Sequence, residues 1–168
     1  NRSGIPIKPL YGPDDLNGGL NQDSYMNSLG FPGDGPTTRG IHASMHRGRP
    51  WSPRLVVGLD LPEDYNARMR ALYDIGLTGL YVAPCNSHMR GFDPDEVEPE
   101  LLGHCGTVIA SAEDMRVCLD GLPIDKYSTS LGCSAPYTLS AFLFAVAKRR
   151  GIAWNKLAGT TNQSDYLS

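Results

Sequence analysis

The stretch of this 168-residue sequence with the clearest chemical character is rich in arginine and histidine. Residues 39–54 read RGIHASMHRGRPWSPR and hold four arginines and two histidines. No Asp or Glu occurs between Asp34 and Asp60, although the whole chain has a formal net charge of -3. Because guanidinium groups bind phosphate oxygens in a bidentate manner, this acid-free segment predicts a site for an anionic ligand. A solvated basic loop is the alternative interpretation.

Other residues that could do chemistry form weaker patterns. His42 and His46 are four residues apart and could share a helical face with a metal ion, but no helical glutamate motif accompanies them, so we expect no metal site. Ser128, Thr129 and Ser130 lie on an expected strand, where their hydroxyl groups could line a ligand channel or simply reflect strand propensity. The sequence has no Gly-x-Ser-x-Gly motif and no glycine-rich phosphate loop after a strand.

Composition excludes several classes of protein. Hydrophobic residues make up 40% and charged residues 20%, which is typical of a folded domain. No apolar run approaches the roughly 18 residues of a membrane span, no signal peptide is visible, and the acidic balance argues against non-specific nucleic-acid binding. The four cysteines form no Cys-x-x-Cys pair, so free thiols in a reducing cytoplasm are the simplest interpretation.

Hydrophobic patterning places most secondary structure after residue 54. Short apolar runs predict strands over 55–58, 79–83, 127–131 and 157–161. Helical spacing predicts helices from Pro62 to a stop at Gly76, from Ser111 to Gly121, and over 136–150, with Ser111 and Asp114 resembling a capping box. Residues 84–105 form a long polar loop, which is usually functional in a compact domain.

Residues 1–40 show little periodicity and are dominated by Gly, Pro, Asn and Asp, so we expect an extended arm, with disorder as the alternative. The alternation of strands and helices in 41–168 implies an α/β fold with a parallel sheet and right-handed crossovers. A closed eight-stranded barrel of this type needs about 250 residues, so the chain has room for about half of one. An open four-stranded sheet is the structural alternative.

Several blocks of the sequence resemble the N-terminal part of the methylmalonyl-CoA mutase family, the adenosylcobalamin-dependent acyl-CoA mutases. They follow the family's order over almost the whole chain: GIPIKPLY at 4–11, TRG at 38–40, the block ending RPW at 49–51, TGL at 78–80, RGFDPD at 90–95, DGLPIDK at 120–126, STS at 128–130 and LAGT at 157–160. The resemblance implies an N-terminal arm (1–40) that contacts another subunit and the first half of a (β/α)8 TIM barrel (41–168) that binds acyl-CoA.

The resemblance also implies site residues. Positions that match CoA contacts of the family are Ser44, Met45, Arg49, Ser52 and Arg54, with Arg49 and Arg54 expected to meet phosphates. Ser130 matches a serine of the substrate channel, Tyr81 stands where the family usually has a serine, and His42 replaces an aromatic residue near the acyl end.

One departure bears on the substrate. Mutases that act on methylmalonyl-CoA carry a tyrosine beside the acyl group, and Val56 occupies that position here. The loss of a hydrogen-bond donor and the added space predict a branched or hydroxylated acyl-CoA instead of methylmalonyl-CoA.

The chain contains no Asp-x-His-x-x-Gly segment, which supplies the cobalt-ligating histidine in the family. The resemblance therefore implies that adenosylcobalamin is bound mainly by a region or partner outside this chain, that the isolated chain is inactive, and that it associates with the rest of a barrel as a homo- or hetero-oligomer. Two alternatives remain: a non-catalytic module that binds acyl-CoA or a subunit, and an unrelated small α/β fold.

Overall fold

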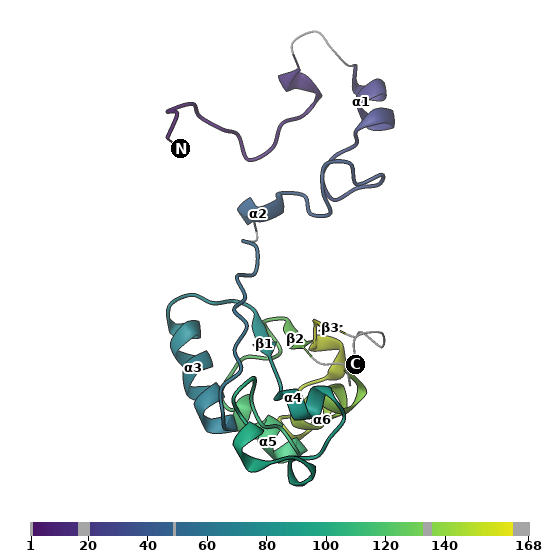
Figure 1. Ribbon diagram of the computed structural model, residues 1–168. Coiled ribbons are helices and arrows are strands. Elements are labelled where there is room, and N and C mark those ends of the chain that lie inside the picture. The colour runs from purple at the N-terminus through teal and green to yellow at the C-terminus, as the bar shows by residue number, and fades with distance from the viewer. Residues whose placement is uncertain (1, 17–20, 49, 133–135, 163–168) are drawn as a thin grey trace. The chain divides into compact units, whose positions relative to one another are not determined.

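The chain folds into two compact units, Asn1–Trp51 and Ser52–Ser168 (Figure 1). A computed structural model describes residues 2–16, 21–48, 50–132 and 136–162. Within these residues, no helix is both long enough and apolar enough to span a bilayer.

The first unit contains more helix than its composition indicates. Its elements are the 3-10 turn η1 (Pro13–Asp15), helix α1 (Gln22–Ser28) and the short helix α2 (Met45–Gly48). The side chain of Asn21 caps α1 by accepting a hydrogen bond of 2.8 Å from the Ser24 amide. Sequence patterning missed α1 because it is seven residues long and buries one side chain, Tyr25, so it shows no apolar repeat.

The second unit alternates helices and strands as the sequence predicts. In chain order its elements are α3 (Pro62–Asp74), β1 (Leu80–Val82), α4 (Asn86–Met89), η2 (Pro94–Glu96), η3 (Pro99–Leu101), α5 (Ala112–Cys118), β2 (Thr129–Gly132), α6 (Pro136–Arg149), η4 (Trp154–Lys156) and β3 (Gly159–Asn162). The three long predicted helices and three of the four predicted strands are confirmed, with ends that shift by a few residues.

The sheet is parallel, with β1, β2 and β3 side by side in chain order (Figure 1). The remaining predicted strand, at 55–58, was wrong, because this region forms no continuous strand. It makes only two isolated parallel bridges, from Arg54 to Gly79 and from Val57 to Val82. Pro53, just before this segment, has no amide proton to donate to a ladder. The sheet thus has three strands and one loosely attached neighbouring segment.

Local sequence signals explain how the helices begin and end. Pro62 opens α3 at a position where its missing amide proton is harmless, and Gly76 follows the helix with φ of 104°. Ser111 and Asp114 form the expected capping box of α5: the Ser111 hydroxyl accepts from the Asp114 amide at 3.2 Å, and the Asp114 carboxylate accepts from the Ser111 amide at 2.8 Å.

The hydrophobic core lies between one face of the sheet and helices α3, α5 and α6. Leu80, Val82 and Leu131 contribute from the strands and pack against buried side chains of the helices, including Tyr65 and Met115. The Tyr65 hydroxyl donates to the Tyr81 carbonyl at 2.9 Å, which fixes α3 against β1. Because side chains alternate along a strand, this core leaves Tyr81 and Ser130 on the opposite face.

The long polar segment after β1 is ordered by short turns and backbone hydrogen bonds. The Cys85 amide donates to the Thr107 carbonyl at 2.8 Å, and the Gly103 amide donates to the Cys85 sulfur at 3.4 Å. These bonds close the segment back onto the C-terminal end of β1.

Candidate functional site

The sheet face opposite the core carries most of the polar side chains of the strands. Parallel register places Tyr81 beside Ser130 and Ser130 beside Thr160. The two isolated bridges have the same offset, so Val56 lies next to Tyr81 on this side. We call this side the open face; its residues are Arg54, Val56, Tyr81, Ser128, Ser130, Gly132, Thr160 and Asn162.

Arg54 lies at the N-terminal end of the open face. Its side chain crosses Gly79, where an added Cβ would stand 2.8 Å from Nε, and its guanidinium donates to the Ser128 hydroxyl. Among the described residues Arg54 makes no ion pair. A guanidinium with one neutral partner keeps its charge and further N–H donors for an anionic ligand.

The middle of the open face combines a hydroxyl pair with an apolar side chain. Ser130 and Thr160 are 2.7 Å apart between their hydroxyl oxygens. Ser130 is only 3% exposed, whereas Val56 is 66% exposed. Ser130 therefore forms a buried polar centre, and the face is open to solvent both at Val56 and along β3, whose residues are exposed.

Tyr81 reaches across the C-terminal part of the open face. From β1 its phenol passes over Gly132 of β2, where an added Cβ would lie 2.6 Å from Cζ, and accepts a hydrogen bond of 3.3 Å from Asn162 Nδ2 on β3. Gly132 is the register partner of Asn162, so the Tyr81 and Asn162 side chains together span two strand spacings, about 10 Å.

The structure brings four predicted site residues together on the open face: Arg54, Val56, Tyr81 and Ser130. Ser52 is exposed at the start of the same unit. Sequence reasoning did not assign Thr160 or Asn162 to the site. The available signal was that Thr160 and Asn162 are two residues apart in an expected strand and so share a face. Their alignment with Ser130 and Gly132 depends on the register of the sheet.

His42, Ser44 and Met45 belong to the first unit, and Arg49 lies outside the described residues. Met45 packs against Gly40, where an added Cβ would lie 2.7 Å from its Cε, and the Ser44 hydroxyl packs against Gly48. These residues therefore belong to a tight turn in the acid-free segment.

Two other arginines of the acid-free segment hold the first unit together. Arg39 donates to the Tyr11 carbonyl at 2.6 Å and to the Tyr25 hydroxyl, and its guanidinium lies 5.7 Å from the centre of the Tyr25 ring. Arg47 donates to the Ile7 carbonyl at 3.2 Å. Backbone carbonyls thus engage these two guanidinium groups, whereas the anionic-ligand site expected in the acid-free segment stays a prediction.

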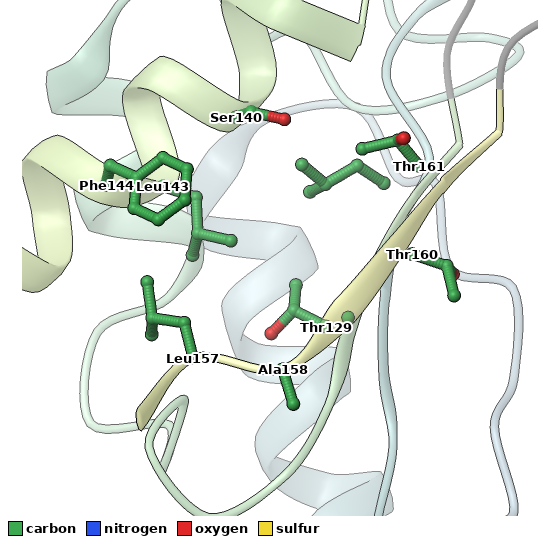
Figure 2. Close-up of a pocket in the computed structure, with 10 residues that line it drawn as sticks. Thr129, Ser140, Leu143, Phe144, Leu157, Ala158, Thr160 and Thr161 are labelled. Carbon is green, nitrogen blue, oxygen red and sulfur yellow. The ribbon is translucent and has the colours of Figure 1, made fainter. Parts of the chain in front are cut away.

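A pocket of about 220 Å³ lies on the helix side of the sheet, between α6 and β3. Figure 2 shows Leu143, Phe144 and Leu157 gathered on this side, whereas the Thr160 side chain points away from α6. None of the described lining residues is charged. The pocket therefore lies on the other side of the sheet from the open face, and its described lining offers no charged group for a phosphate.

The described residues contain no cluster of three or more His, Cys, Asp or Glu side chains that could hold a metal ion. His46 instead stacks on Trp51, with ring centres 5.2 Å apart. His88, in α4 beyond the C-terminal end of β1, has a buried Nε2 without a hydrogen-bond partner among the described residues, and burial lowers its pKa.

Comparison with known proteins assigns the family. The family model described as methylmalonyl-CoA mutase matches residues 1–168. The chain is 38% identical to the methylmalonyl-CoA mutase of Rhizobium meliloti (strain 1021) over 98% of this chain and 22% of that protein. It is 35% identical to the Escherichia coli (strain K12) methylmalonyl-CoA mutase, also over 98% of this chain and 22% of that protein.

A relative whose name gives a different substrate also matches. The chain is 30% identical to the 2-hydroxyisobutanoyl-CoA mutase large subunit of Aquincola tertiaricarbonis over 97% of this chain and 28% of that protein. The chain thus spans between a fifth and a third of the length of these relatives. Because the match extends along the whole chain at these identities, the chain belongs to the methylmalonyl-CoA mutase family.

Proposed function

We propose that this chain forms part of an adenosylcobalamin-dependent acyl-CoA mutase, an isomerase, and that its open face binds the acyl-CoA substrate. The observation that carries the proposal is the alignment of Arg54, Val56, Tyr81 and Ser130 on one face of a parallel sheet. Family membership supports the chemistry, and the uncovered face supplies a surface on which an extended ligand can lie along the strands.

The proposal extends to architecture. In the second unit, segment 54–57, β1, β2 and β3 are neighbours in chain order and all parallel, which is the arrangement of the first half of a (β/α)8 barrel. In such a barrel the open face becomes the inner wall. Residues 1–40 would then be the arm that contacts a partner subunit.

The proposed site divides into a phosphate end and an acyl end. Arg54, with no ion pair among the described residues, supplies charge for a CoA phosphate, and Arg49, Ser52, Ser44 and Met45 are further proposed CoA contacts. Val56 and His42 shape the acyl end. An aliphatic side chain at position 56 offers no hydrogen bond to a carboxylate, so the proposed substrate is a branched or hydroxylated acyl-CoA, as the name of the Aquincola relative also suggests.

Adenosylcobalamin supplies radical chemistry when it is bound to a mutase of this type. The sequence contains no Asp-x-His-x-x-Gly segment, so we propose that a region or partner outside this chain holds the cofactor. The role proposed for this chain is to bind the CoA portion and to form part of the wall around the acyl group.

The test uses the complete enzyme and an Arg54→Ala variant. We expect the KM for acyl-CoA to rise about tenfold or more with little change in kcat, because one charge-assisted hydrogen bond to phosphate contributes about 1.5–3 kcal/mol to binding. Arg68→Ala removes an exposed arginine from α3 and is the matched control. Equal KM values in wild type and Arg54→Ala would contradict the assignment, and CoA binding without any turnover in the complete enzyme would favour a non-catalytic module.

A further inference from the structure

The side chains of Tyr81 and Asn162 meet at the C-terminal end of the open face. In parallel α/β structures, ligands react at the carboxyl ends of the strands. Gly132 and Asn162 are the last residues of β2 and β3, and the phenol of Tyr81 lies over them. Tyr81 begins level with Ser130 and Thr160, but the contact of its phenol with Asn162 lies farther toward the carboxyl end of the face.

The geometry of this contact depends on a glycine. Any side chain at position 132 would collide with the tyrosine ring, because an added Cβ would lie 2.6 Å from Cζ and 2.7 Å from Cε1. Gly132 has no positive φ, so the requirement is for space and not for an unusual backbone conformation. Glycine at position 132 therefore leaves room for the tyrosine ring over this part of the face.

The hydrogen bond between Asn162 and Tyr81 leaves one further donor and one further acceptor close together. Asn162 Nδ2 donates to the tyrosine oxygen, so the phenol O–H and the amide Oδ1 have no partner among the described residues. A hydroxyl group both donates and accepts hydrogen bonds, and it matches this arrangement. A carboxylate only accepts, and it would face the lone pairs of Oδ1.

We infer that Tyr81 and Asn162 determine substrate specificity by binding a hydroxyl group on the acyl chain of the substrate. This inference rests on the proposed function and names its substrate class: a hydroxylated, uncharged acyl-CoA. Tyr81 and Asn162 contact the substrate, and Asn162 also holds the phenol by its hydrogen bond. Gly132 acts indirectly, because it leaves space for the tyrosine ring.

The test compares two substrates on the complete enzyme: 2-hydroxyisobutanoyl-CoA and isobutanoyl-CoA, which lacks the hydroxyl. Tyr81→Phe keeps the ring and removes the phenol oxygen. We expect the ratio of kcat/KM for the hydroxylated over the plain substrate to fall about tenfold, as the loss of one hydrogen bond predicts. Asn162→Ala should lower the same ratio, and Tyr73→Phe, on α3, should leave it unchanged.

The outcomes separate this inference from the proposed function. An unchanged ratio in Tyr81→Phe, in an enzyme that still turns over acyl-CoA, would overturn the inference alone. A wild-type preference for methylmalonyl-CoA over both substrates would also overturn it. Failure of the wild-type complete enzyme to bind any acyl-CoA, measured by calorimetry, would overturn the proposed function and the inference together.

Discussion

Arg39 and Arg54 carry the same guanidinium group but have different partners. Arg39 donates to a backbone carbonyl and to a tyrosine hydroxyl, whereas Arg54 has a single serine partner among the described residues. A count of charges treats the two side chains alike. The difference arises because Arg39 lies beside folded backbone in its own unit, while Arg54 lies at the edge of an open sheet face.

At the residue scale, Val56 gives a direct test of acyl selectivity. We expect Val56→Tyr to raise kcat/KM for methylmalonyl-CoA about tenfold relative to isobutanoyl-CoA, because the phenol adds a hydrogen-bond donor for the carboxylate. Val56 is 66% exposed in this unit, so a larger side chain has room there. The measurement is the ratio of kcat/KM for the two substrates in the complete enzyme.

The control for this experiment is Ile75→Tyr, which adds a tyrosine at a position that is 81% exposed just after α3. This variant should leave the ratio unchanged. If the wild-type enzyme already prefers methylmalonyl-CoA, the substrate class proposed from Val56 is wrong.

At the scale of elements, two side chains cross from one strand region toward another near the two ends of β2. Arg54 crosses Gly79 to reach Ser128 just before β2, and Tyr81 crosses Gly132 to reach β3. In both cases the glycine belongs to the strand region that is crossed. Glycine in a strand usually weakens the strand, so its presence indicates a close approach that the fold requires.

Substitution of Gly132 tests the coupling between strands. We expect Gly132→Ala to lower the free energy of unfolding by about 1–3 kcal/mol, as overpacking does, because the Tyr81 ring must move. Tyr81→Ser should remove most of this penalty when it is combined with Gly132→Ala. Urea denaturation of the wild type, both single variants and the double variant gives the interaction energy. Additive effects of the two substitutions would contradict the contact.

At the scale of the whole molecule, the two units contain different parts of the proposed site. The second unit has its own core and the open face, and the first unit carries His42, Ser44 and Met45. All four residues of β3 are exposed, as expected of an edge strand with no further strand beside it among the described residues. A closed barrel would cover this edge.

The isolated 168-residue chain should have no mutase turnover when it is supplied with acyl-CoA and adenosylcobalamin. The reason is that the sequence has no Asp-x-His-x-x-Gly segment. The measurement is product formation by the purified chain, with the complete enzyme as the positive control. Turnover by the chain alone would contradict the proposal that cofactor binding lies elsewhere.

The sequence by itself determined the order of helices and strands in the second unit, because apolar spacing and caps such as Ser111–Asp114 act over a few residues. Resemblance of short blocks also predicted the family, which the match over residues 1–168 confirms. Sequence patterning missed α1, because one buried side chain leaves no periodic signal. It overestimated the strand at 55–58, because a short apolar run does not show whether a segment forms a continuous ladder.

Only the tertiary structure decided which polar side chains share a face. Strand register depends on backbone hydrogen bonds between distant segments, such as the bond from the Leu80 amide to the Ser128 carbonyl, and no local pattern encodes that alignment. The same holds for the arginines of the acid-free segment, whose partners lie 14 to 74 residues away. The candidate residues came from the sequence, whereas their grouping into a site came from the packing of distant strands.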